Sequence, residues 1–170
     1  MDPLLKRLQE EVCASVATFS PEQLMWHPAG KWCAAEVLEH LYLTYTGTTK
    51  GFQRVLAAGS PKVTPATWKQ RGGAVLVFGF SYLPSGREAP SFSRPRGLAS
   101  ETVRAEVEAK IAEMDAILST CEAKFGARSK VLDHAILGPL TIHQWRKFHL
   151  VHGRHHIKQI QRLRAAAESD

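Results

Sequence analysis

The chain has 170 residues, which suits a single domain, and 44% of them are apolar, enough to build a core. No run approaches the roughly 18 apolar residues of a membrane span, and the N-terminus becomes charged too early for a signal peptide, so we expect one cytoplasmic domain over residues 1–170. The three cysteines are far apart and form no CxxC pair, which excludes a disulfide framework and a thiolate zinc knuckle.

The first 58 residues show helical periodicity with clear start signals. Asp2 before Pro3 is typical of an N-cap, and the leucines and valines that follow predict a helix to about Phe19. Residues 20–23 form a capping box that starts a short helical turn ending near Trp26. After a loop at 27–30, the pattern predicts a helix from Lys31 to about Ala58.

The middle of the chain, residues 59–97, is rich in proline, glycine and serine. Within it, residues 74–80 form a compact apolar run that suits either a short helix or a buried extended segment, and periodicity does not decide between them. Connections of this length in a small domain are usually functional or have structure of their own. We therefore expect a partly ordered crossover that packs over one end of the domain.

The last third returns to helical spacing. Ser100 is a plausible N-cap for a helix that stops at Gly126, and a loop is predicted over 127–139. Residues 141–144 form another capping box and open a last helix that runs to about Ala167. Four substantial helices without a convincing strand pair indicate an all-α fold, namely a four-helix bundle with a long crossover connection.

The last helix carries histidines at a spacing suited to metal binding. His152 and His156 lie one turn apart, so both rings can direct a nitrogen at one point. Their side of the helix should face the interior, because it also carries Trp145, His149, Gln159 and Leu163. A buried ring needs a polar partner. A metal ion would satisfy both rings at once, but a carboxylate, a tyrosine or a carbonyl could also serve each ring.

A metal site needs a third protein ligand, and His40 is the natural candidate. It lies in the middle of a helix, within an otherwise apolar stretch, and has no capping role. Glu36 and Glu39 are close enough in sequence to act as alternative ligands or to support one. His149 is on the correct face, one turn away, and suits either a residue that supports a ligand or a contact with substrate. The other histidines are expected in loops, in a first turn, or off the metal face: His27, His134, His143 and His155.

Two segments resemble the DinB superfamily, which includes metal-dependent hydrolases and bacillithiol- and mycothiol-dependent transferases. One is 32–41, similar to the "W…e…HL" helix of that superfamily, and the other is 148–160, similar to its "H…HH…qI" segment; the approach at 28–32 also fits. The resemblance implies a four-helix bundle with three histidine ligands for nickel or zinc. It places the ligands on His40, His152 and His156, with water or substrate in the remaining positions.

Such a site would leave open positions on the ion, which suits two reactions. An activated water molecule would give a hydrolase, and a bound low-molecular-weight thiol, as thiolate, would give an S-transferase acting on a small-molecule substrate. Residues near the predicted site could assist proton transfer, but the sequence ranks none of them: Glu36, Glu39, Tyr42, Thr44 and Tyr45. Arginines of the crossover could bind an anionic group, although a solvated loop is the simpler interpretation: Arg87, Arg94 and Arg96.

Other interpretations stay open at this stage. The histidines could be structural in a non-catalytic helical binding protein. The net charge of +6 and the basic residues of the last helix permit nucleic-acid binding, but they fit a solvated helix face better: Arg154, Lys158, Arg162 and Arg164. A homodimer is compatible with the predicted fold, and no membrane contact is expected.

Overall fold

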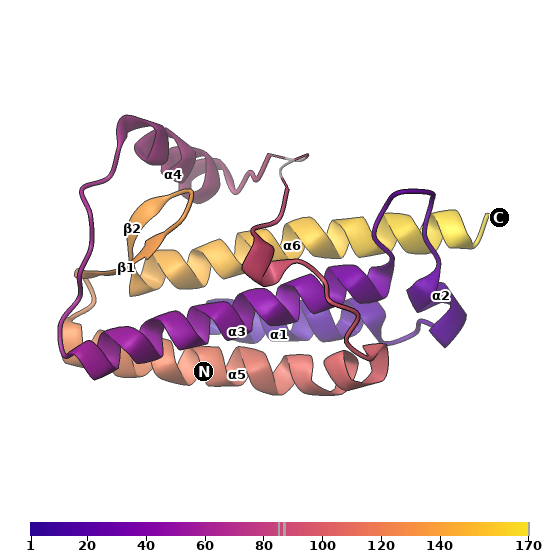
Figure 1. Cartoon of the computed structure of the whole chain (residues 1–170), viewed down its shortest axis with the longest axis horizontal. Coiled ribbons are helices and arrows are strands. Elements are labelled where there is room, and N and C mark those ends of the chain that lie inside the picture. Colours follow the sequence, from indigo (N-terminus) through magenta and orange to yellow (C-terminus); the bar gives the residue numbers. More distant parts are fainter. Residues whose placement is uncertain (85, 87, 170) are drawn as a thin grey trace.

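Four long helices dominate the part of the chain that this computed structural model describes, namely residues 1–84, 86 and 88–169. They are α1 (Pro3–Val16), α3 (Ala34–Ala58), α5 (Ser100–Phe125) and α6 (Ile142–Ala167), and they lie along the long axis of the molecule (Figure 1). Helices α1 and α3 each pack against both α5 and α6. The prediction of a mainly helical chain is therefore confirmed.

The apolar stripes of the four helices meet in one continuous core. The largest fully buried side chains come from all four helices and from the segment before α6, and they include Leu5, Leu8, Leu38, Leu41, Tyr45, Phe52, Ile111, Met114, Leu140 and Ile160. None of the described helices is long and apolar enough to cross a membrane.

Side-chain caps fix most of the helix starts. Asp2 caps α1, and Ser20 forms the predicted capping box at α2 (Pro21–Met25). Two expected boundaries were wrong. Helix α3 begins at Ala34 rather than at Lys31, because Cys33 acts as its N-cap. Helix α1 ends at Val16, before the expected end near Phe19.

The start of α5 also differs from the expectation. Ser100 was predicted to be the N-cap, but the N-cap is Ala99, without a side-chain hydrogen bond, and Ser100 is the first helical residue. The predicted stop at Gly126 is confirmed, since this glycine has a φ of 92°, a value that side-chain-bearing residues rarely adopt.

The crossover contains the helix α4 (Trp68–Phe80) and the 3₁₀ turn η1 (Ser91–Ser93). The apolar run at 74–80 is therefore helical, which decides the question that periodicity left open. Helix α4 lies against the first half of α6, where the Lys147 ammonium donates a hydrogen bond of 2.6 Å to the Phe78 carbonyl. The turn η1 packs on α3 (Figure 1). The crossover thus covers the side of the molecule formed by α3 and α6.

A small antiparallel hairpin precedes α6, where the sequence predicted only a loop. Its strands are β1 (Lys130–His134) and β2 (Gly138–Thr141), and their register is irregular between Lys130 and Leu132. The expectation of no strand pair was wrong because these strands are very short and β2 begins with Gly-Pro, which is unusual within a sheet. Val131 and Leu140 extend the core from the hairpin.

Candidate metal centre

Three histidine rings from two helices meet in the interior. His152 and His156 stand one turn apart on α6, and His40 faces them from the first half of α3. Nε2 of His152 lies 3.3 Å from Nε2 of His40 and 3.2 Å from Nε2 of His156. One ring nitrogen from each of the three lies within 4.8 Å of the others. The structure thus brings together the three histidines that the sequence singled out, and this group can hold a metal ion.

The outward nitrogens of two of these rings are already bound to fixed acceptors. Nδ1 of His40 donates to the Ser93 carbonyl at 2.7 Å, and Nδ1 of His156 donates to Oε1 of Gln159 at 3.0 Å. A neutral imidazole has one N–H and one lone pair. With Nδ1 as the donor, both rings must carry the lone pair on Nε2, which points it at the centre of the group. Such outer hydrogen bonds are the usual way to fix the tautomer of a metal-binding histidine.

The spacing of the nitrogens fits a shared divalent ion. Two nitrogens that each lie about 2.1 Å from one metal are about 3.0 to 3.4 Å apart when the angle between them is about 90 to 110°. The separations of His152 from His40 and from His156 lie within this range, and the nitrogens of His40 and His156 lie within 4.8 Å of each other. Without a cation, a single proton on Nε2 of His152 would have to serve the lone pairs of both neighbours. The arrangement of donors therefore suits a metal better than it suits the three rings alone.

The protonation of the rings also suits a metal, which requires neutral imidazole. Burial lowers the pKa of His40, and burial together with the neighbouring His40 lowers the pKa of His156 to about 3. Burial and the two neighbouring histidines lower the pKa of His152 well below its usual value. The lowered pKa values favour the uncharged form of all three rings at neutral pH.

The crossover is tied to the site by a buried carboxylate. Glu39 is only 2% exposed, and its oxygens accept hydrogen bonds from the backbone N–H groups of Arg96, Gly97 and Leu98 at 2.7 to 3.2 Å. These bonds hold the end of the crossover on α3, close to the point where Ser93 reaches His40. Glu39 was considered as an alternative ligand, but its carboxylate serves as this anchor.

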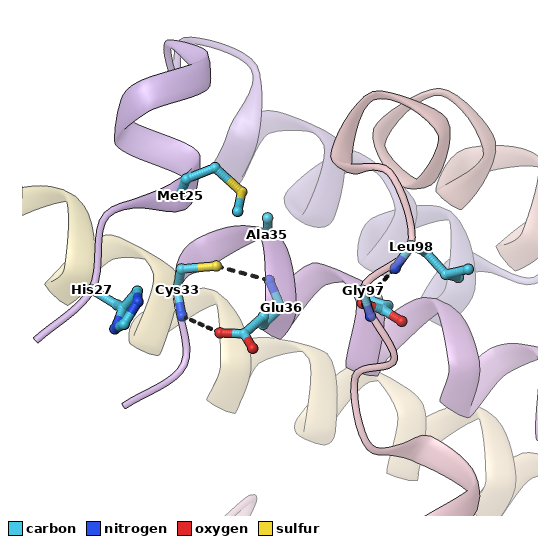
Figure 2. A pocket seen from close by; sticks show the side chains of 8 residues that line it. Met25, His27, Cys33, Ala35, Glu36, Gly97 and Leu98 are labelled. Atoms are coloured by element: carbon cyan, nitrogen blue, oxygen red, sulfur yellow. Dashed lines mark hydrogen bonds between the residues drawn. The ribbon is translucent and has the colours of Figure 1, made fainter. Parts of the chain in front are cut away.

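Glu36 is likewise engaged at the start of α3. Its carboxylate accepts from the Cys33 backbone N–H at 2.9 Å, and Cys33 Sγ accepts from the Glu36 N–H at 3.4 Å (Figure 2). These residues line a cavity of about 210 Å³ with Met25, His27 and Leu98. Burial raises the pKa of the Cys33 thiol, so this cysteine is a cap and not an activated nucleophile.

The hydroxyl groups considered for proton transfer have different environments. Tyr42 donates to Glu106 on the surface, and Thr44 donates to the carbonyl of His40 within α3. Tyr45 is fully buried, and burial raises its pKa far above the ordinary value. Among the described residues, none of these three hydroxyls forms a hydrogen bond with a ring nitrogen of the histidine group, so their role in proton transfer stays a prediction.

The remaining histidines lie outside the group of three. His149 is fully buried one turn before His152. His134 is not in a loop as expected but ends β1, where its Nδ1 accepts from the N–H groups of Ile136 and Leu137 and so fixes the hairpin turn. His155 leaves the metal face, as expected, and His27 and His143 lie outside the core.

Several of the basic residues of the crossover and of α6 have local partners. The guanidinium of Arg94 bonds to Glu88 and to the Ala89 carbonyl, and that of Arg96 donates to the Phe92 carbonyl. Arg87, the third arginine considered for anion binding, lies outside the described residues. On α6, Arg154 forms a two-point ion pair with Glu11. These contacts favour the interpretation that the arginines stabilise the surface of the fold.

Two residues with a role at the site were not assigned one from the sequence. Gln159 was placed on the metal face by its spacing, yet nothing in the sequence indicated that it binds the outer nitrogen of His156. Ser93 acts through its backbone carbonyl, which every residue possesses, so its identity gives no signal. Only the path of the crossover in space reveals it.

Comparison with known proteins gives a family for this chain. A search of curated proteins and a search of solved structures each found no match. A family described as a protein of unknown function, DUF1569, matches residues 5–163, which include all three histidines of the group and most of the chain. The chain belongs to the DUF1569 family.

Proposed function

We propose that the chain binds one divalent metal ion, nickel or zinc, through Nε2 of His40, His152 and His156, and that it is a metal-dependent enzyme. The observation that carries this proposal is the convergence of three neutral imidazole nitrogens, two of them with tautomers set by outer hydrogen bonds. The resemblance of residues 32–41 and 148–160 to the DinB superfamily supports it, as does the helical packing, which suits a four-helix bundle of that type.

A bound ion with three imidazole ligands would supply a Lewis acid that makes a water molecule or a thiol acidic enough to act as a nucleophile near neutral pH. The reaction we propose is therefore hydrolysis of a small molecule or transfer of a low-molecular-weight thiol to one. Ligands from two helices leave positions on the ion for these reactants. His156 is only partly buried, whereas His40 and His152 are buried, so reactants would enter on the side of His156.

The residues around the rings would orient them and limit the access of water. Ser93 and Gln159 hold two rings in place through their outer nitrogens. Phe148 stacks on His152 with ring centroids 5.3 Å apart, and Trp32 lies 5.5 Å from His40. This apolar surrounding lowers the local dielectric constant, which strengthens electrostatic interactions at the site.

Elemental analysis of tag-free protein tests the proposal, with a His152→Ala/His156→Ala variant alongside. We expect about one metal ion per chain in the native protein after loading and none in the variant. Activity against esters and amides without thiol would indicate a hydrolase, and activity that needs an added low-molecular-weight thiol would indicate a transferase. If the native protein binds no divalent metal under any loading condition, the proposal fails, and a non-catalytic binding protein with structural histidines becomes the better account.

A further inference from the structure

A second group of buried polar atoms lies beside the three histidines, between α3 and α6. Both ring nitrogens of His149, the hydroxyls of Tyr45 and Thr49, and Nδ1 of His152 have no hydrogen-bond partner within the described part of the chain. The side chains are deeply buried: His149 and Tyr45 are 0% exposed, and Thr49 is 2% exposed. Buried polar atoms in folded proteins almost always have a partner, in the protein or in ordered water.

The residues that carry these atoms lie on the facing helices α3 and α6. His149 lies one turn before His152 on α6, and its ring meets the Tyr45 ring edge-on with centroids 5.6 Å apart. The Tyr45 hydroxyl reaches the backbone of α6, because it lies 3.5 Å from the position that a Cβ at Gly153 would take. Thr49 follows Tyr45 by one turn on α3. Tyr45 and Thr49 on α3 and His149 on α6 therefore lie in the segments of these helices next to those that carry the three histidines.

Neighbouring polar groups have hydrogen-bond partners, in contrast to these atoms. The hydroxyls of Thr44 and Thr46 donate to carbonyls of their own helix, four residues earlier, whereas the Thr49 hydroxyl does not. The Trp145 indole, which stacks near His149, donates to the Leu132 carbonyl. The only other unpartnered buried atoms in the described residues belong to Asp115 and Arg146, and these face each other as an ion pair at 3.6 Å.

We infer that His149, Tyr45 and Thr49 bind internal water, and that this water accepts a hydrogen bond from Nδ1 of His152. The bond would hold the third ring in the tautomer that presents its lone pair at Nε2, as Ser93 and Gln159 do for the other two rings. His149 and Tyr45 are then positioning residues for His152. This inference rests on the proposed metal-binding function, because only a ligand role requires that tautomer.

Water is the ligand that fits this mixture of groups. Nδ1 of His152 must donate if Nε2 is to bind a metal, whereas a neutral His149 offers one donor and one acceptor, and each hydroxyl offers both. A buried water molecule can accept and donate at once, and it typically makes two to four hydrogen bonds to groups of this kind. An anion would accept hydrogen bonds only from the donors among these groups, and a cation would bind only the acceptors.

Zinc affinity of single variants tests the inference, measured by competition with a chromogenic chelator. His149→Phe removes both ring nitrogens and Tyr45→Phe removes only the hydroxyl, while each keeps an aromatic ring. Loss of an outer partner of a metal-bound histidine typically weakens metal binding about 10- to 100-fold. We expect a loss in this range for His149→Phe and a smaller loss for Tyr45→Phe. His143→Phe, at an exposed position of the same helix, should bind zinc like the native protein.

Nuclear magnetic resonance of ¹⁵N-histidine-labelled, zinc-loaded protein supplies a second readout that packing alone would not change. In the native protein we expect a protonated Nδ1 on His152 with a water contact, and in the His149→Phe variant a faster exchange of that proton. If the native protein binds zinc while both variants keep full affinity and His152 shows no water contact, the inference is wrong but the metal site stands. If the native protein itself binds no zinc, the proposed function is what fails.

Discussion

One face of α6 carries His152 and His156, which form a first group with His40, and a second site with His149 alone, and the two differ in what their nitrogens contact. Nε2 of His152 lies 3.3 Å from Nε2 of His40 and 3.2 Å from Nε2 of His156. His149, one turn earlier, is more deeply buried than either and has no partner for its ring nitrogens among the described residues. The same residue type on one helix face thus has two different surroundings. His152 and His156 form a close group with His40 of α3, whereas the His149 ring meets the Tyr45 ring of α3 edge-on.

Removal of His40 should have the largest effect, because it takes a whole ligand from the first group. His40→Ala should weaken zinc binding by more than about 100-fold, since loss of an outer partner alone typically costs 10- to 100-fold. Chelator competition measures the affinity. A matched His143→Ala variant, altered at an exposed histidine, should be unaffected. Undiminished affinity in His40→Ala would remove this residue from the ligand set.

The next largest effect should come from weakening the contact between Glu39 and the crossover. Glu39→Gln keeps the shape of the side chain but removes the charge that three backbone N–H groups contact. Hydrogen bonds to a charged group contribute about 1.5 to 3 kcal/mol each, so we expect the free energy of unfolding to fall by about 2 to 3 kcal/mol. Urea denaturation measures this change. Glu10→Gln, on the surface of α1, serves as the control, and an equal loss in both variants would contradict the anchoring role.

Removal of Gln159, which accepts a hydrogen bond from Nδ1 of His156, should weaken metal binding less than removal of His40. Gln159→Leu leaves Nδ1 of His156 without its acceptor, so the ring loses its preference for the correct tautomer. We expect metal affinity to fall about 10- to 100-fold with little change in the helical content. Gln161→Leu, at an exposed position two residues later, is the matched control. If both variants bind metal equally well, Gln159 does not orient the ring.

Acid should destabilise the metal-free protein through its buried neutral histidines, His149 and His134. Burial lowers the pKa of His149 to about 3 and that of His134 to about 4, from an ordinary value of 6.5. At pH values between the ordinary pKa of 6.5 and the lowered pKa values of the folded protein, these histidines bind protons in the unfolded chain but not in the folded chain. The free energy of unfolding therefore falls as the pH drops below about 6.5. Each such histidine contributes a slope of at most about 1.4 kcal/mol per pH unit.

In the variant His149→Phe, the free energy of unfolding should fall less steeply with decreasing pH, because one of the histidines that contribute to the slope is absent. Urea denaturation at several pH values from 7 to 4 measures the slope for native and variant proteins. An unchanged slope would mean that His149 is protonated in the folded protein, which would contradict its burial as a neutral ring.

The sequence predicted the histidine group because its signal is local. The four-residue spacing of His152 and His156 determines where they lie on a helix, and His40 stood out as a polar residue in an apolar helical stretch. The partners of these rings depend on the path of the chain in space. The Ser93 carbonyl reaches His40 from 53 residues away, and no side-chain pattern marks a backbone acceptor.

Helix boundaries and the hairpin illustrate the same limit. Long periodic segments were found, but the start of α3 was placed three residues early, at Lys31 instead of Ala34, because a cysteine is an unusual cap. The strands β1 and β2 are too short to show alternation, and their pairing is stabilised by contacts with the core that Val131 and Leu140 make. Features set by tertiary packing were thus missed, whereas features set by helical spacing were predicted.

The most direct test of the metal site is an anomalous-difference map from a crystal of the nickel-loaded protein. We predict one strong peak within bonding distance of Nε2 of His40, His152 and His156, with no peak of similar height elsewhere on the chain. A peak bound by other residues, or a fully loaded crystal with no density between these three rings, would contradict the account.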